Sequence, residues 1–208
     1  MMKILWNENQ TVLDTEMVKT AGTTEFKYEN FTGRITMAKT DCEVENGSFT
    51  LVIRNAGYLD GTAEPLKPWS AEANQIIWQG GTVKSGKLDC RSWQDGGFNG
   101  TSLHCSEFHN GVFNGGELHC NVFHKGEVNS GKVVCSSWKK GRFNGESLQC
   151  DSWTCGSFES GEFTGTWLEG YFRNGNFKGN WKGGTWFGGT FNGESYVGDG
   201  SFEAIRKG

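Results

Sequence analysis

The sequence predicts an all-β protein, a three-sided β-solenoid of about 15 residues per coil preceded by a small N-terminal β-rich domain. Two observations predict the solenoid: a large apolar residue recurs at every fifth position from residue 78 to residue 163, and residue types recur at every third such step. A spacing of five matches neither an α-helix nor a long half-buried strand. It suits a strand of about three residues followed by a corner. A fixed repeat indicates stacked units, so three sides are expected to close one coil.

Residues 1–77 differ from the rest of the chain, because they show no five-residue step and contain both prolines. Three segments read as strands: residues 48–54 and, more weakly, 24–28 and 32–37. Asn46-Gly47 and residues 55–57 are turn signals. We expect a β-rich domain that either caps the first coil or docks on a partner, joined to the solenoid through residues 64–68.

The solenoid is expected to span residues 78–200, and its three steps differ. The first step carries Trp or Phe, with glycine three residues later. The second step carries Phe or Val and is followed by an Asn-Gly or Ser-Gly pair. The third step carries Leu or Val, with cysteine two residues later. Glycine and Asn-Gly supply the backbone freedom that corners need. The predicted core anchors are Trp78, Trp93, Phe98, Leu103, Phe108, Phe113, Leu118, Phe123, Trp138, Phe143, Leu148, Trp153 and Phe158.

The repeat becomes less regular toward the C-terminus. One-residue deletions precede Trp167 and Trp181, and each is expected to be a tightened corner. The step is expected to continue as far as Tyr196. Residues 201–208 form a tail that is expected to act as a cap.

Five cysteines share one repeat position and are expected to form an inward ladder of buried free thiols: Cys90, Cys105, Cys120, Cys135 and Cys150. Free cysteine is a small and often buried hydrophobe. An odd total of seven cysteines and no visible signal peptide favour synthesis in a reducing compartment. Disulfides between stacked neighbours are the minor alternative.

The four histidines form two pairs that should stack on an outer face, His104 with His119 and His109 with His124. Each follows an anchor directly and therefore points outward, while the cysteines point inward. Tetrahedral zinc needs converging ligands. We therefore expect solvated histidines, no metal and no cofactor, and keep structural zinc as the minor alternative.

Composition and motifs argue against several functional classes. A net charge of −4, with acidic and basic residues mixed along the chain, argues against a positively charged surface that would bind nucleic acid. No segment reaches transmembrane length. Asp89, Asp95 and Asp151 are scattered over different sides and coils, and neither a G-x-S-x-G motif nor a P-loop occurs. We expect no enzyme, no catalytic residues, and neither nucleic acid nor membrane as a partner.

The five-residue step with a central Phe or Leu distantly resembles pentapeptide-repeat β-helix proteins, whose coils have four steps and some of which are DNA mimics. The run from Gly179 to Gly193, GNWKGGTWFGGTFNG, resembles the GGTW-type repeats of Gly/Trp-rich structural proteins of tailed bacteriophages more closely. This resemblance covers roughly residues 78–200. It implies a virion part made in the host cytoplasm.

We therefore expect a non-enzymatic structural protein of a tail, baseplate, neck or fibre. The solenoid would be a rigid spacer or decoration, and the N-terminal domain would attach to other virion proteins or to copies of the chain itself. A module that binds a host glycan or protein through the solenoid face is the alternative. A pentapeptide-like DNA mimic is the second alternative.

Overall fold

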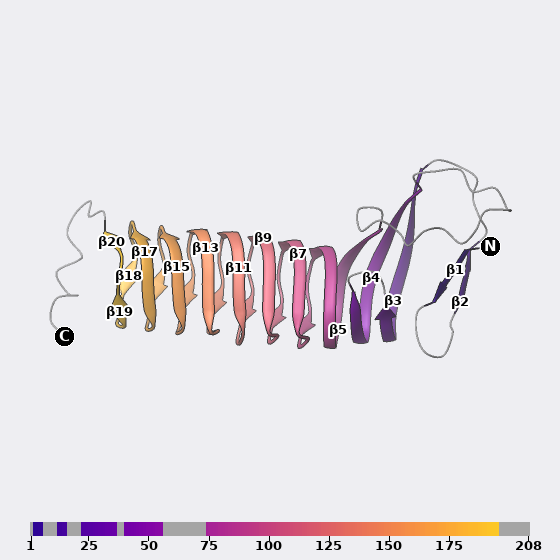
Figure 1. Ribbon diagram of the computed structural model, residues 1–208, viewed down its shortest axis with the longest axis horizontal. Helices are drawn as coiled ribbons and strands as arrows, with labels where there is room; N and C mark the ends of the chain where they lie inside the picture. The colour runs from indigo at the N-terminus through magenta and orange to yellow at the C-terminus, as the bar shows by residue number, and fades with distance from the viewer. Residues whose placement is uncertain (1, 6–11, 16–21, 37–39, 56–73, 196–208) are drawn as a thin grey trace.

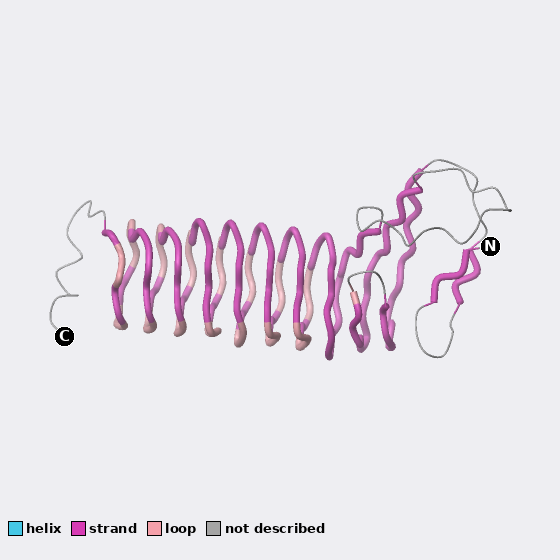
Figure 2. Tube along the Cα trace, viewed as in Figure 1, coloured by secondary structure: helices cyan, strands magenta, loops and turns pink. Residues whose placement is uncertain are grey.

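The computed structural model describes residues 2–5, 12–15, 22–36, 40–55 and 74–195, and every regular element in these ranges is a β-strand. Successive strands lie side by side along one long axis (Figures 1 and 2). The chain forms a parallel β-solenoid of about seven turns with about 15 residues per turn. The predicted fold class is confirmed.

Each turn of the solenoid contains one long strand and one short strand. The long strands are β5 (Asn74–Trp93), β7 (Ser102–Phe108), β9 (Glu117–Phe123), β11 (Lys132–Trp138), β13 (Ser147–Trp153), β15 (Glu162–Trp167) and β17 (Asn176–Trp181). The short strands are β6 (Gly97–Phe98), β8 (Val112–Phe113), β10 (Glu127–Val128), β12 (Arg142–Phe143), β14 (Ser157–Phe158), β16 (Tyr171–Phe172) and β18 (Thr185–Trp186). In the last coil, β19 (Thr190–Phe191) and β20 (Glu194–Ser195) pair with the two ends of β17 and take the place of a long strand.

The long strands bend, so that each covers two of the three sides. Between β7 and β9, Cys105 pairs with Cys120 and Glu107 pairs with Val122, which leaves one residue on each strand outside the ladder. That residue stands at a corner. Paired residues are 15 apart, as a coil of three steps requires, and a coil of four five-residue steps is thereby excluded.

The predicted anchors are all buried, with at most 1 % of each exposed. They stack in columns along the axis. From Trp78 to Trp181 the rings of the first column have centroids 3.8–6.0 Å apart and planes within 9° of parallel. Rings of different columns meet edge to face, as Trp93 and Phe98 do at 84°. Both arrangements are favoured by the quadrupoles of aromatic rings.

Glycine is required where the first step turns into the second. Gly96 and Gly111 have φ of 113° and 116°, in the left-handed region. A Cβ at either position would collide with the carbonyl oxygen of the equivalent glycine one coil earlier. The corner glycines therefore form a column of their own, with backbone packed on backbone.

The one-residue deletions fall at the predicted corners. Cys150 pairs with Gly165, and the next pair is Ser152 with Thr166, so the residue at the corner after the cysteine position has been lost. Gly165 has φ of 146° and leaves no room for a Cβ against the carbonyl of Cys150. The cysteine column therefore ends where the tightened corners begin.

The last expected anchor is misplaced by one residue. The step after Phe191 is also shortened, because Ser195 pairs with Trp181. Ser195 thus takes the place that the five-residue step assigned to Tyr196. Tyr196 and the tail at 201–208 lie outside the described residues.

The N-terminal strands cover the first coil. A hairpin joins β1 (Met2–Leu5) and β2 (Val12–Thr15), while β3 (Gly22–Thr36) and β4 (Asp41–Asn55) form an antiparallel sheet with β5. β4 pairs with residues 74–87 of β5, and Phe49 stacks on Trp78 with centroids 5.9 Å apart. β3 and β4 thus continue the solenoid core as an antiparallel hairpin, in which β4 runs opposite to β5 and β3 runs in the same direction as β5.

The structure also refines the expected N-terminal elements. The strand at 48–54 lies within β4, and the weaker segments 24–28 and 32–37 belong to a single strand, β3, as far as residue 36, while residue 37 lies outside the described residues. Asn46-Gly47 is wrong as a turn between strands, since it forms a bulge inside β4 with φ of 51° at Asn46. The boundary drawn at residue 77 falls inside β5, and the linker at 64–68 lies outside the described residues.

Candidate functional site

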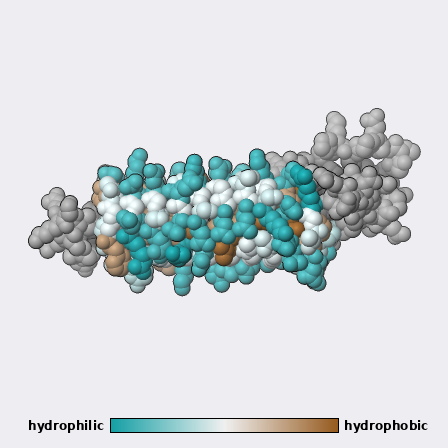
Figure 3. Space-filling view, turned by 90° about the horizontal axis from the view of Figure 1, so that it is seen from below, coloured by the Kyte–Doolittle hydropathy of each residue, from teal (hydrophilic) through white to brown (hydrophobic). Residues whose placement is uncertain are grey.

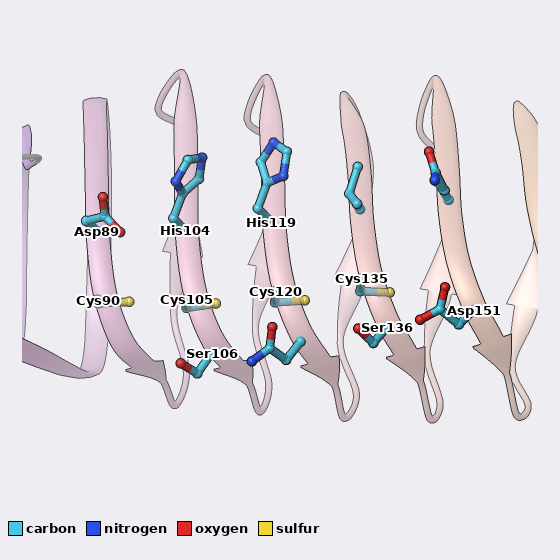
Figure 4. A pocket seen from close by; sticks show the side chains of 13 residues that line it. Asp89, Cys90, His104, Cys105, Ser106, His119, Cys120, Cys135, Ser136 and Asp151 are labelled. Carbon is cyan, nitrogen blue, oxygen red and sulfur yellow. The ribbon is translucent and has the colours of Figure 1, made fainter.

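A shallow groove of about 470 Å³ follows the outer side of the long strands from β5 to β13 (Figure 4). Its floor is the cysteine column. Its walls are the outward residues on either side of each cysteine, such as His104 and Ser106 beside Cys105. Titratable and nucleophilic side chains from five successive coils gather along it.

The cysteines form the predicted ladder, with Cys90, Cys105, Cys120, Cys135 and Cys150 in consecutive register. Each is between 2 and 9 % exposed, and all seven cysteines of the chain are free thiols. The hydrogen bond with Cys135, and then burial, raise the pKa of the Cys150 thiol well above its usual value. A thiol that keeps its proton is neither a good nucleophile nor a good metal ligand.

The His104–His119 pair also lies on this groove, with ring centroids 4.7 Å apart and planes at 71°. Figure 4 shows the two rings displaced from the neighbouring sulfur atoms, which point along the axis toward the next coil. No group of three converging ligand atoms includes a described cysteine. The divergence that the sequence predicted for cysteines and histidines is therefore present.

The two groove carboxylates do not form an acid–base pair. Asp89 and Asp151 lie at opposite ends of the groove, on β5 and β13 (Figure 4). Four coil steps separate these strands, which is about 19 Å at ~4.8 Å per step. Paired carboxylates of glycosidases stand roughly 5–9.5 Å apart. Asp95 lies outside the groove and accepts a hydrogen bond from the Gly96 amide at 2.7 Å.

A second polar cluster occurs on the adjoining side of the coil, at the end of β7 and β9. The imidazoles of His109 and His124 stack with centroids 4.6 Å apart and planes at 7°. The Oε2 atom of Glu107 lies 3.0 Å from Nε2 of His109 and 3.6 Å from Nε2 of His124. We call these three residues the carboxylate–histidine cluster.

Sequence reasoning found the two histidines of this cluster but missed Glu107. The available signal was an E-x-H triplet with a second histidine 15 residues further on, since that spacing places both imidazoles in one column. Residues 107 and 109 flank the buried anchor Phe108, so strand alternation places both side chains on the outer face. The signal for Glu107 was therefore present in the sequence.

An exposed aromatic pair near the C-terminal end is the third candidate. Tyr171 and Phe187 are 52 % and 58 % exposed, and their ring centroids lie 6.3 Å apart. The Arg173 guanidinium stands 5.1 Å from the centre of the Phe187 ring. We call these three residues the outer aromatic patch. On the face in Figure 3 the solenoid is mostly hydrophilic, with small apolar spots.

Polar ladders support the outer surface between these sites. The Asn114 amide donates to Asn99 Oδ1 at 2.9 Å, and the Asn129 amide donates to Asn114 Oδ1 at 3.1 Å. The Asn-Gly corners are thus joined by side-chain hydrogen bonds as well as by backbone ones.

Comparisons of the chain with protein-family models, with curated proteins and with solved structures returned no match. Within the described part of the chain, no helix has the length and apolarity to cross a bilayer.

Proposed function

We propose that the chain is a non-enzymatic structural component of a bacteriophage virion, in which the solenoid is a rigid spacer or decoration. One observation carries the mechanical part: the first aromatic column runs without interruption from Phe49, in the N-terminal sheet, to Trp181. Because each ring contacts the next, bending the solenoid would separate stacked rings and strain the parallel ladder beside them.

The assignment to a virion is supported by the resemblance of the Gly179–Gly193 run to phage structural repeats. In this proposal the N-terminal strands attach the solenoid to other virion proteins or to further copies of the chain. The chemistry of the groove is compatible with a structural role, because the pKa values of Cys105, Cys120, Cys135 and Cys150 are raised and the two carboxylates are far apart.

Sedimentation of native particles tests this proposal. An antibody raised against the recombinant chain should detect it in the particle band of a density gradient, and gold-labelled antibody should decorate particles in electron micrographs. Recovery of the chain only from the soluble fractions at the top of the gradient would contradict the proposal.

The outer aromatic patch favours a second candidate, a module that binds a host glycan. Exposed aromatic rings next to an arginine suit a sugar, which stacks its apolar face on a ring and offers hydroxyls to a guanidinium. The isolated protein should then bind a glycan array or host cells, and the double variant Tyr171→Ala/Phe187→Ala should lose this binding. Leu168→Ala, at another exposed apolar residue, is the matched control.

A further inference from the structure

We propose that Glu107, His109 and His124 form a binding site for a divalent transition-metal ion, for which zinc is the appropriate probe. The three ligand atoms all lie within 4.8 Å of one another, and they form the one such group of three among the described residues. The proposal is independent of the virion assignment.

The spacing of the ligand atoms fits tetrahedral coordination. Zinc binds imidazole nitrogen at ~2.0–2.1 Å and carboxylate oxygen at ~2.0–2.2 Å, so two ligand atoms of a tetrahedral site stand roughly 3.3 Å apart. The two distances from Glu107 Oε2 to the imidazole nitrogens, 3.0 and 3.6 Å, bracket this value. Because the two rings are stacked with planes at 7°, their lone pairs lie in nearly parallel planes, and both rings must rotate out of the stack about χ2, a torsion with a broad minimum, to converge on one ion.

The Nε2 atom of His124 supplies an independent reason. It is fully covered, and no hydrogen-bond partner for it exists among the described residues. Covered polar atoms without partners are rare in proteins, and binding of an ion is one of their recognised explanations. A metal ion at this point would accept the lone pair of His124 Nε2. It would also bridge His124 Nε2 and Glu107 Oε2, which are 3.6 Å apart and too distant for a hydrogen bond.

Glu107 and His109 open the site to solvent, with side chains 50 % and 40 % exposed, although Nε2 of His124 itself is covered. The column of the two histidines continues with Gln94 in the preceding coil and Lys139 in the following one. The column of Glu107 contains Ser92 and Val122. The Lys139 side chain is exposed and flexible, so its ammonium can turn to solvent when a cation binds.

The ligand set selects the class of metal. Two imidazoles and one carboxylate suit zinc and its first-row neighbours, whereas magnesium and calcium prefer oxygen ligands alone. With three protein ligands, a fourth position remains for water or for a group of another molecule, as in zinc sites that keep an open position.

Titration calorimetry of the full chain with zinc chloride tests the site. The wild type should bind one equivalent saturably, and His124→Gln should abolish this binding. Glu107→Gln should weaken it by about tenfold or more, since loss of even a supporting residue at metal sites costs roughly 10–100-fold in affinity. Magnesium chloride should give no binding.

The second histidine pair provides the matched control. His104→Gln/His119→Gln changes two stacked histidines whose rings stand at 71°, and it should leave zinc affinity unchanged. Cobalt substitution should give a visible spectrum without thiolate charge-transfer bands, which separates this site from the cysteines. Binding that survives His124→Gln, binding lost in the control, a thiolate spectrum or no saturable binding by the wild type would each overturn the proposal.

Discussion

At the scale of single residues, the corner glycines set the strictest requirement. Gly111→Ala would place a Cβ against the carbonyl of Gly96 in a backbone with φ of 116°. The positive φ alone costs an L-residue about 1–2 kcal/mol. We expect a loss of about 2 kcal/mol or more in the free energy of unfolding, measured by urea denaturation. Gly97→Ala is the control, since its nearest neighbour would be Thr82 Oγ1 at 3.7 Å, and a similar loss there would contradict this account.

The buried tryptophans divide by what their indole nitrogens contact. The Trp93 indole donates to the carbonyl of Asn110 at 3.0 Å, while the indole nitrogen of Trp138 has no partner among the described residues. Trp93→Phe and Trp138→Phe remove similar volume. Phe is compatible with the first aromatic column, because Phe108 already stacks there between Trp93 and Phe123. Because a hydrogen bond contributes about 1 kcal/mol, we expect Trp93→Phe to cost about 1 kcal/mol more. Equal losses in urea denaturation would show that the indole bond contributes nothing.

Thiol reactivity tests the cysteine ladder and its pH dependence. Burial raises the pKa of Cys42 to about 12, and hydrogen bonding with burial raises those of Cys120, Cys135 and Cys150. Native protein should therefore expose one rapidly alkylated thiol, the half-buried Cys155, and the others should react only after unfolding.

The raised pKa values of these thiols determine how the free energy of unfolding changes with pH. Unfolded cysteines lose their protons near pH 8.5, whereas the folded ones keep them, so the thiols favour the folded state below that pH. Stability should fall as pH rises from about 8.5 toward 12, and thermal unfolding across this range measures it. Replacement of Cys120, Cys135 and Cys150 by alanine should flatten the profile, and an unchanged slope would assign it to other groups.

At the scale of elements, the coil of three steps is the unit that can be removed. Deletion of residues 129–143 removes three steps and keeps like residues stacked, so Trp153 follows Phe123 in the first column. Neighbouring repeats interact mainly with each other. We expect a cooperative thermal transition lowered by only a few degrees, about the effect of ~1–2 kcal/mol in a domain of this size.

Deletion of residues 129–138 is the informative counterpart. It removes two steps, keeps the spacing of five, and places Leu148 over Phe123 while the corner glycines lose their register. Circular dichroism should show loss of most of the cooperative transition. Equal stability of the two deletions would mean that five residues, not 15, form the repeating unit.

The same scale shows why the sequence predicted some elements and not others. Period and residue type placed Trp153 over Trp138 and each shortened step at a corner, because parallel coils repeat the same side chains at the same positions. β4 runs antiparallel to that direction, so Phe49 reaches the first column without following the five-residue step. Glu107 meets the two histidines because residues 107 and 109 lie on either side of the buried Phe108 and share the outer face, a relation that a search for equal residues 15 apart does not reveal.

At the scale of the whole molecule, the N-terminal sheet closes one end of the core. β4 satisfies the edge of β5 over residues 74–87. Just beyond, the Thr40 hydroxyl accepts a hydrogen bond from the Asp89 amide at 3.0 Å and donates one to its carbonyl at 3.2 Å. Without these contacts the first coil would present unpaired backbone groups and the face of Trp78, and open edges of this kind associate.

Deletion of residues 1–73 should therefore turn the chain into an associating species. The truncated protein would expose the edge of β5, and two copies can pair there, so light scattering after size exclusion should report dimers or larger assemblies. Deletion of residues 1–21 is the control, because it keeps β3 and β4 in place on the first coil. The control should have the same mass distribution as the full chain. If the longer deletion matched it as well, β4 would not be what protects this end of the solenoid, and the attachment role proposed for the N-terminal strands would have to be sought on another surface.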